Sequence, residues 1–349
     1  MQQMVVGEKV KDMIIHLTSD CQLDCTHCYV PHEKDKKELT IEDLEWVAKT
    51  FDIRNVMLMG GEPLMYPYLK EAIDLFKNVT ISTNGLALAG NDKEQFIDLF
   101  KKKGRENFSA QLSIEGLENE TNTIRGDGVW QKVMMSTKLL LDNDIRCYLR
   151  IGYHKGNINS IPKIIKDICA PMNVPLILVP RTDLSPLDIG QQIWLFDMIM
   201  EHNNKYQNYN DEKRIICLIA QPHFMQWLGQ EGRCEAGSER LNITYNREIT
   251  PCQFDWHHII GNIGDELSFI NNNRTDFLDR YKKIHSSCSF CEHASVCKSS
   301  CYVAQSHFGC PLKQNFTLGN YIKINKVDVG SIQTQIMGMK DLLRGSLVC

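Results

Sequence analysis

Fourteen of the 349 residues are Cys, and their spacing is the feature of this sequence most able to do chemistry. Three of them lie within eight residues, and a second group lies between residues 234 and 310. The N-terminus lacks the pattern of a signal peptide, which favours a reducing compartment. There, clustered Cys serve metal or redox chemistry more often than disulfides. The spacing therefore predicts two regions that bind metals or clusters.

The first group, Cys21-x-x-x-Cys25-x-x-Cys28, places three thiols on one short loop. Iron–sulfur clusters are usually held by four Cys, so three would leave one iron open to a substrate or cofactor. A zinc site is the alternative, with His27 or His32 as the fourth ligand. The triplet alone leaves both hypotheses open.

The segments that must position these thiols alternate between strand-like and helix-like patterns. Short apolar runs end at turn residues and are separated by segments of helical periodicity. This order predicts a parallel α/β sheet, in which functional loops leave the carboxyl ends of the strands. The expected strands are 13–17, 56–59, 79–82, 110–114, 146–151 and 176–179, and the expected helices include 93–103, 129–141, 161–168 and one capped by Thr40.

The pattern changes after residue 190. Residues 190–230 are expected to be helical, with an apolar stripe of Trp194, Leu195, Met198 and Ile199. Residues 241–250 are typical of a β-hairpin that turns at Asn246-Arg247, where Asn would accept a positive φ. Residues 286–310 are rich in Cys, Ser and His and too poor in apolar residues to pack alone, which favours a bound metal.

Two motifs at consecutive strand ends, the Cys triplet and Gly60-Gly61-Glu62-Pro63, resemble the radical SAM superfamily. The resemblance implies a [4Fe–4S] cluster on Cys21, Cys25 and Cys28, whose fourth iron is chelated by the amino and carboxylate groups of S-adenosylmethionine (SAM). His27 stands where the family often has an aromatic residue. The likeness continues in Ser82-Thr83-Asn84-Gly85, Leu112-Ser113-Ile114-Glu115-Gly116 and Arg125-Gly126-Asp127-Gly128.

The same resemblance implies which residues bind SAM. A backbone carbonyl or the Glu62 carboxylate would accept from the SAM ammonium. Arg150 is an alternative to Arg125 for the carboxylate, and a local salt bridge is the alternative role for Arg125. A plain turn is the alternative for Asn84-Gly85. The expected SAM-binding residues are Gly60, Gly61, Glu62, Asn84, Ser113, Glu115 and Arg125.

The second Cys group resembles the SPASM extension that follows some radical SAM domains. That likeness implies two auxiliary [4Fe–4S] clusters, one of them short of a fourth Cys ligand unless Cys217 or another side chain reaches it. Two zinc knuckles are the alternative. The implied ligands are Cys288, Cys291, Cys297 and Cys310 for one cluster and Cys234, Cys252 and Cys301 for the other, whereas Cys147 and Cys169 are expected to be buried apolar residues.

Together these features predict a partial (β/α)6 TIM-like barrel followed by a small Cys-rich SPASM domain with a β-hairpin and two auxiliary iron–sulfur clusters. The expected boundaries are 1–185 for the radical SAM core, 186–233 for a helical bridge, 234–312 for the SPASM domain and 313–349 for a C-terminal tail.

The resemblance implies an oxidoreductase that cleaves SAM reductively to a 5′-deoxyadenosyl radical. The radical would abstract hydrogen from a peptide or protein side chain, which is then oxidised or crosslinked while the auxiliary clusters accept the electron. Anaerobic sulfatase-maturating enzymes have Asp directly after the second hairpin Cys, but this chain has Gln253, which cannot take a proton. Asp255 is therefore the expected catalytic base, with His257 and His258 as alternatives.

Other functions stay open at this stage. Peptide-crosslinking relatives often begin with a leader-binding domain, for which Cys21 comes too early, so a precursor would be recognised by the core or by a separate protein. A radical SAM enzyme acting on a small molecule, by haem-pathway decarboxylation or sugar-alcohol oxidation, is one alternative. A zinc-binding interaction protein is the second, although it has no need of Gly60-Gly61-Glu62-Pro63.

Composition narrows the partners and the location. The chain is 43% hydrophobic and 23% charged, as in ordinary globular proteins. Its net charge of -4 gives no basic field for nucleic acid, and no stretch is apolar for long enough to cross a bilayer. We expect an anaerobic, cytoplasmic enzyme without nucleic-acid or membrane partners, supplied with electrons by a low-potential donor such as ferredoxin or flavodoxin.

Overall fold

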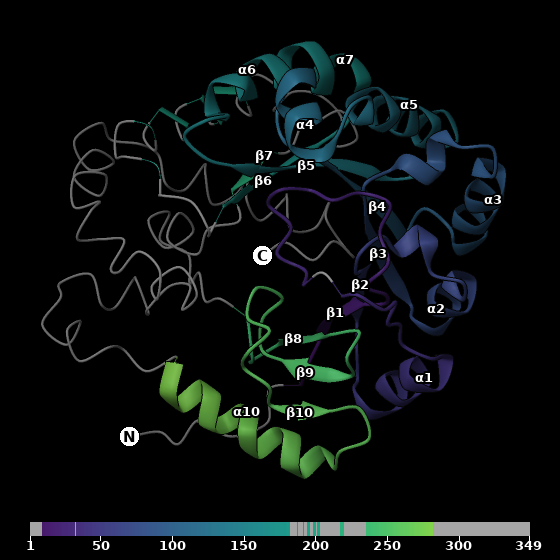
Figure 1. Ribbon diagram of the computed structural model, residues 1–349, viewed down its shortest axis with the longest axis vertical. Coiled ribbons are helices and arrows are strands. Elements are labelled where there is room, and N and C mark those ends of the chain that lie inside the picture. Colours follow the sequence, from purple (N-terminus) through teal and green to yellow (C-terminus); the bar gives the residue numbers. More distant parts are fainter. Residues whose placement is uncertain are drawn as a thin grey trace, which may run out of the picture.

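A ten-stranded mixed sheet that does not close on itself organises the computed structural model (Figure 1). The strand order is β10-β9-β8-β1-β2-β3-β4-β5-β6-β7. The pairs from β8 through β1 to β7 are parallel, whereas β9 pairs antiparallel with both β8 and β10. The structure describes residues 9–31, 33–181 and 235–281, together with positions 187, 191, 194–195, 198–199, 201–202 and 217–219.

The first six strands form the predicted half-barrel. They are β1 (Asp12–His16), β2 (Asn55–Met59), β3 (Asn78–Thr83), β4 (Phe108–Ile114), β5 (Cys147–Tyr153) and β6 (Leu176–Pro180). Each expected strand is confirmed to within two residues at its ends. The connections between them place helices on the outside of the curved sheet (Figure 1).

The α-helices of this half are α1 (Ile41–Thr50), α2 (Leu69–Leu75), α3 (Lys93–Lys103), α4 (Glu118–Arg125), α5 (Val129–Asp142), α6 (Ile161–Ile164) and α7 (Ala170–Met172). Short 3₁₀ turns are η1 (Pro63–Met65), η2 (Leu86–Ala89) and η3 (Ile158–Ser160), and the π-helical turn η4 (Ile165–Cys169) joins α6 to α7. Thr40 caps α1 as predicted. Its hydroxyl accepts a hydrogen bond from Asp43 N at 3.2 Å, and its backbone N donates one to the Asp43 carboxylate.

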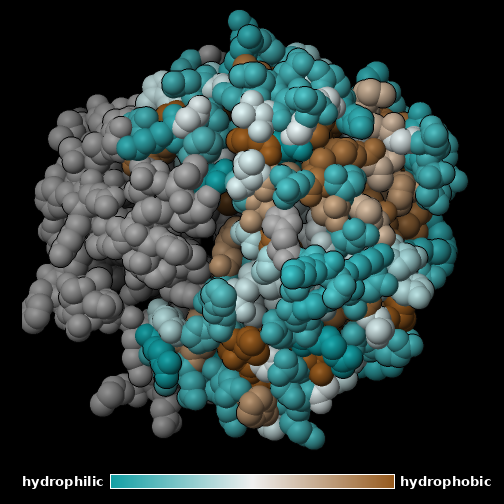
Figure 2. Space-filling view, in the orientation of Figure 1, coloured by the Kyte–Doolittle hydropathy of each residue, from teal (hydrophilic) through white to brown (hydrophobic). Residues whose placement is uncertain are grey.

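Side-chain alternation divides the sheet into two faces. On β1, Met13 and Ile15 point outward into the main apolar core beneath the helices, whereas Ile14 belongs to a separate inward cluster with Met57 and Met59. Hydrophilic residues cover most of the outer surface seen in Figure 2, with hydrophobic patches between them. The outward side chains thus pack in the main core with the helices, and the inner face carries the smaller apolar cluster.

The C-terminal elements extend this sheet. They are β7 (Cys217–Ile219), β8 (Arg240–Ile243), β9 (Glu248–Thr250), β10 (Gly261–Asn262) and α10 (Leu267–Tyr281). The predicted hairpin is confirmed as β8 and β9, and β8 pairs directly with β1. The hairpin thus lies in the same sheet as the half-barrel (Figure 1).

Three local expectations are wrong. Residues 217–219 form a strand parallel to β6, because completing the sheet outweighs the helical pattern there. In the hairpin turn Arg247, at φ 69°, takes the positive φ in place of Asn246. Trp194 is 40% exposed and so departs from the expected apolar stripe, whereas Leu195 and Ile199 are buried.

Candidate active site

A cavity of about 370 Å³ lies at the carboxyl ends of the parallel strands. The three thiols of the first group and all seven residues expected to bind SAM line it. They are Cys21, Cys25, Cys28, Gly60, Gly61, Glu62, Asn84, Ser113, Glu115 and Arg125. The sequence rule that functional loops follow parallel strands thus gathers residues from four separate loops in one place.

The thiol loop is attached to the end of β2 by backbone bonds. Gly61 N donates to Thr18 O at 2.6 Å, and Glu62 N donates to Asp20 O at 2.7 Å. A Cβ at Gly61 would lie 2.2 Å from Asp20 O. Glycine is therefore required here for the approach of two backbones.

The three thiols line one cavity and are candidate metal ligands. Within the part of the chain that the structure describes, no three His, Cys, Asp or Glu side chains converge where a single metal ion could bind. A zinc site needs such convergence, with ligands about 2.0–2.3 Å from the metal, whereas a cluster bonds each thiolate through a different iron. The three thiols on this loop supply the three cysteine ligands that a cluster with one open iron requires.

Burial of the three cysteines favours their neutral thiol form until a positively charged metal centre binds. Burial raises the pKa of the Cys21 thiol to about 11, and burial also raises the pKa of the Cys25 and Cys28 thiols. Metal ligands must be thiolates, so binding of iron displaces these protons. Asn84 contacts the loop directly, because its Nδ2 lies 3.8 Å from Cys21 Sγ.

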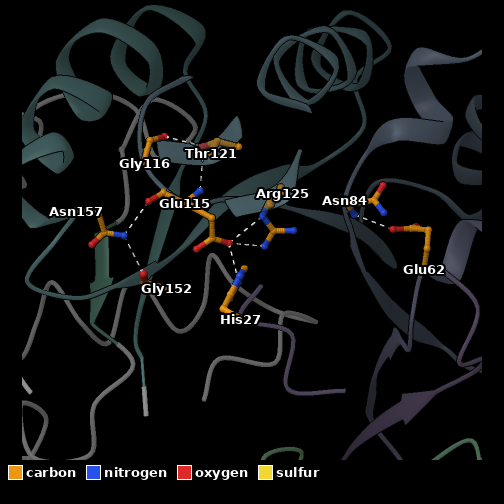
Figure 3. Close-up of polar contacts among 9 residues, drawn as sticks. All are labelled: His27, Glu62, Asn84, Glu115, Gly116, Thr121, Arg125, Gly152 and Asn157. Carbon is orange, nitrogen blue, oxygen red and sulfur yellow. Dashed lines mark hydrogen bonds and ion pairs between the residues drawn. The ribbon is translucent and has the colours of Figure 1, made fainter. Parts of the chain in front are cut away.

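The Glu62 carboxylate is occupied by the protein itself. Oε1 accepts from Leu64 N at 3.0 Å and from Thr83 Oγ1 at 2.6 Å, and Oε2 accepts from Asn84 N at 2.8 Å. Burial raises the pKa of this carboxyl group. Glu62 thus joins the ends of β2 and β3 (Figure 3), and it also lines the cavity in which SAM is expected to bind.

Glu115 is the centre of a second polar network (Figure 3). Its Oε1 accepts from His27 Nε2 at 3.0 Å and from Arg125 Nε at 2.8 Å and Nη2 at 2.5 Å. Burial alone would raise the pKa of Glu115, but Arg125 and His27 outweigh it and lower that pKa to about 2. Oε2 is buried and has no hydrogen-bond partner in the described part of the chain. One oxygen of this ionised carboxylate, in a residue that lines the cavity, is thus left without a donor.

Sequence reasoning missed the groups that hold the Glu115 backbone. Asn157 Nδ2 donates to Glu115 O at 2.8 Å and to Gly152 O at 3.0 Å, and Glu115 N donates to Thr121 Oγ1 at 3.1 Å. Asn157 follows β5 closely, so the strand-end rule applied to β5 would have marked it. The same rule would have marked Arg181, which lines the cavity directly after β6.

The second Cys region reaches the cavity through an aromatic contact. Phe254, two residues after Cys252, lines the cavity, and its ring centroid lies 4.8 Å from that of Tyr29, the residue after Cys28. Trp256 packs edge-on against His16 at 4.8 Å. Cys252 is half-buried, and the other expected auxiliary ligands, Cys234, Cys288, Cys291, Cys297, Cys301 and Cys310, lie outside the described residues, as does His32.

The expected catalytic base lies apart from the cavity lining. Asp255 Oδ2 lies 3.7 Å from His258 Nδ1, and His258 packs against Phe277 and Tyr281. Neither Asp255 nor His257 is among the residues that line the cavity in the described part of the chain. Cys147 and Cys169 are buried in the apolar core.

Comparison with known proteins identifies the class. The model of the radical SAM superfamily matches residues 15–168. The chain is 27% identical over 265 residues to the sporulation killing factor maturation protein SkfB of Bacillus subtilis, a match that covers 69% of this chain but 60% of SkfB. It is 30% identical over 231 residues to a "Probable GTP 3′,8-cyclase" of Saccharolobus islandicus, which covers 62% of this chain and 70% of that protein.

Among solved structures, Streptococcus suis SuiB bound to its precursor peptide SuiA has a similar fold. The TM-score is 0.71 at 16% sequence identity, over 88% of this chain and 76% of SuiB. The chain belongs to the radical SAM superfamily. Members of this family use a [4Fe–4S] cluster and SAM. These are the cofactors that the thiol loop and the polar residues at the strand ends are expected to bind.

Proposed function

We propose that this protein is a radical SAM enzyme that cleaves SAM reductively and modifies a side chain of a peptide or protein. One observation carries the proposal: three thiols on the β1 loop face the same cavity as the glycines after β2 and the polar groups after β3 and β4. A cluster bound there supplies one electron to SAM, giving methionine and a 5′-deoxyadenosyl radical that removes hydrogen from the substrate. The protein binds SAM and the substrate, orients them and excludes water.

The residues divide this work. Cys21, Cys25 and Cys28 hold the cluster. Asn84 and Ser113 offer a side-chain amide and a hydroxyl to SAM, and the backbone at Gly60-Gly61 lies close enough for direct contact. Glu115 Oε2 accepts a hydrogen bond from SAM, while Arg125 keeps this carboxylate ionised and offers its charge to the SAM carboxylate. These assignments rest on where the side chains lie around the cavity.

A peptide substrate is supported by the similarity to SkfB, a maturation protein. The predicted SPASM domain, 234–312, would follow the core (1–185) and the bridge (186–233) and precede the tail (313–349). It would hold two auxiliary clusters on Cys288, Cys291, Cys297 and Cys310 and on Cys234, Cys252 and Cys301, and these would accept the substrate electron. For Asp255 to act as base, its carboxylate would have to leave His258.

A small-molecule substrate is the second candidate, favoured by the similarity to a probable GTP 3′,8-cyclase. In both cases a low-potential donor such as ferredoxin or flavodoxin would supply electrons under anaerobic, cytoplasmic conditions. No helix in the described part of the chain is long and apolar enough to span a bilayer.

Anaerobic reconstitution tests the proposal. Wild-type protein should bind about twelve irons in three [4Fe–4S] clusters and form 5′-deoxyadenosine after reduction with SAM. The variant with Cys21→Ala, Cys25→Ala and Cys28→Ala should retain auxiliary iron but form none. The matched control, Cys147→Ala with Cys169→Ala, removes two core thiols and should keep both iron and product.

A colourless zinc protein that makes no deoxyadenosine would refute the proposal, and so would deoxyadenosine formation by the triple variant. The two substrate classes are separated by adding either short peptides encoded beside the gene or a metabolite pool. Deoxyadenosine that rises only with metabolites would favour the small-molecule candidate.

A further inference from the structure

The β5 wall of the cavity carries an arginine that the proposed SAM site does not use. Leu149 and Ile151 of β5 point outward into the apolar core, so Arg150 between them points inward, where it lines the cavity. Ser113 is its register partner on β4. Arg150 thus faces the space in front of the proposed SAM-binding strand ends.

Arg150 differs from Arg125 in its partners. Arg125 is paired with Glu115, whereas no carboxylate pairs with Arg150 among the residues that the structure describes. A guanidinium stays charged at any physiological pH. A half-buried charge that lacks a counter-ion is costly, so this wall favours an anionic ligand.

A second cationic side chain lies on the same wall. The Arg181 side chain crosses Gly152, where an added Cβ would lie 3.1 Å from Arg181 Cδ and 3.9 Å from Glu115 Oε2. Gly152 is the next inward-facing position after Arg150 on β5. Two arginines therefore approach one stretch of wall near the Glu115 carboxylate, and Arg150 supplies the charge that pairs with no carboxylate of the described residues.

The carboxylate of SAM is better placed to meet Arg125. Arg125 and His27 share Glu115 Oε1, and Thr26 N donates to Ile124 O at 3.3 Å, so the end of α4 is attached to the thiol loop itself. In the proposed function the amino-acid end of SAM lies at that loop. Arg150, one strand further along the sheet, is then left to the substrate.

We infer that Arg150, with Arg181 beside it, binds a carboxylate of the substrate. This inference rests on the proposed function, because that function places SAM at the thiol loop. The carboxylate is either that of an Asp or Glu side chain or the C-terminal α-carboxylate of a peptide, and both present two oxygens to the guanidinium fork. Arg150 is thus a specificity-determining residue.

Three small probes that differ in charge test the inference. Binding to unreduced, SAM-loaded holoenzyme is measured by ligand-observed NMR for N-acetyl-glutamate methylamide, for N-acetyl-glutamine with a free α-carboxylate, and for the neutral N-acetyl-glutamine methylamide. We expect one of the two carboxylate probes to bind about fivefold more tightly than the neutral probe, and which one does so identifies the source of the carboxylate.

The preference should disappear in Arg150→Gln and persist in Arg150→Lys, which keeps the charge. The control is Arg54→Gln, an exposed arginine before β2, which should change nothing. Equal binding of all three probes to wild-type protein, or an unchanged preference in Arg150→Gln, would overturn the inference. A tenfold loss of SAM affinity in Arg150→Gln would also overturn it, because Arg150 would then belong to the SAM site. Failure of the proposed function shows separately, as wild-type protein that makes no deoxyadenosine.

Discussion

The two buried glutamates of the cavity are used in opposite ways. Glu62, after β2, accepts hydrogen bonds from Leu64 N of its own loop and from Thr83 and Asn84 at the end of β3, and burial raises its pKa. Glu115, after β4, shares one oxygen between Arg125 and His27, has no partner for the other among the described residues, and has a pKa lowered to about 2. One carboxylate joins two strand ends, and the other is held ionised at the cavity wall.

The largest expected effect comes from removing the counter-ion of Glu115. In Arg125→Met the carboxylate loses its cation in a buried setting, so the free energy of unfolding of the metal-free protein should fall by about 3–5 kcal/mol. Urea denaturation followed by circular dichroism measures this. The double variant Arg125→Met with Glu115→Gln should recover much of the loss. Equal instability of the single and double variants would show that Arg125 acts by packing and not by charge.

Removal of the Glu62 acceptors should come next. Glu62→Ala leaves Leu64 N, Thr83 Oγ1 and Asn84 N without their partner, and we expect a loss of about 2–3 kcal/mol in the same urea experiment. Glu62→Gln keeps one carbonyl oxygen and should lose less than half as much. If Glu62→Ala were as stable as wild type, the bonds between the ends of β2 and β3 would not stabilise the fold.

The sequence was sufficient to predict which residues meet at the cavity, because strand periodicity and the parallel order place every β-to-loop junction at one edge. This rule places Cys21, Glu62, Asn84 and Glu115 at that edge, and the resemblance to the radical SAM superfamily singled them out there. It was not predictable which glutamate would join two strand ends and which would pair with cations, because the bonding partners come from separate loops. His27 and Arg125 meet on Glu115 only once the thiol loop and α4 are packed together.

Local sequence signals failed where pairing between distant strands decided the structure. The segment at 217–219 lies in a stretch whose sequence pattern favours a helix, but it joins the edge of the sheet beside β6. The spacing of Asp255 from Cys252 likewise did not predict that its carboxylate lies near His258. Spacing fixes which residues share a loop and leaves the direction of each side chain to packing.

A smaller effect is expected on SAM binding, where substitutions of the two glutamates should again differ. Glu115→Gln neutralises the open oxygen, so the SAM affinity of the unreduced holoenzyme should fall about tenfold, equivalent to about 1.4 kcal/mol. Glu62→Gln should change that affinity by less than about twofold, since both oxygens of Glu62 already accept hydrogen bonds from Leu64, Thr83 and Asn84. Equilibrium dialysis with labelled SAM measures both, and equal losses in the two variants would contradict the assignment of Glu115 as the SAM-binding carboxylate.

The smallest effect is on the pH dependence of stability, which should have opposite signs for the two glutamates. The folded-state pKa of Glu115 is about 2 against an ordinary 4.5, so its stabilisation is complete above pH 4.5 and is lost as the pH falls towards 2. Between pH 7 and pH 4 this loss amounts to about 0.8 kcal/mol. The pKa of Glu62 is raised in the folded state, so its protonation should stabilise the fold as the pH falls through that raised pKa towards 4.5.

Urea denaturation at several pH values would separate the two carboxylates, with wild type compared to Glu115→Gln and to Glu62→Gln. The advantage of Glu115 over Gln should shrink as the solution is acidified, whereas the advantage of Glu62 over Gln should grow. Slopes of the same sign would mean that Arg125 and His27 do not hold Glu115 ionised, and the open oxygen would then be a protonated donor and not an acceptor.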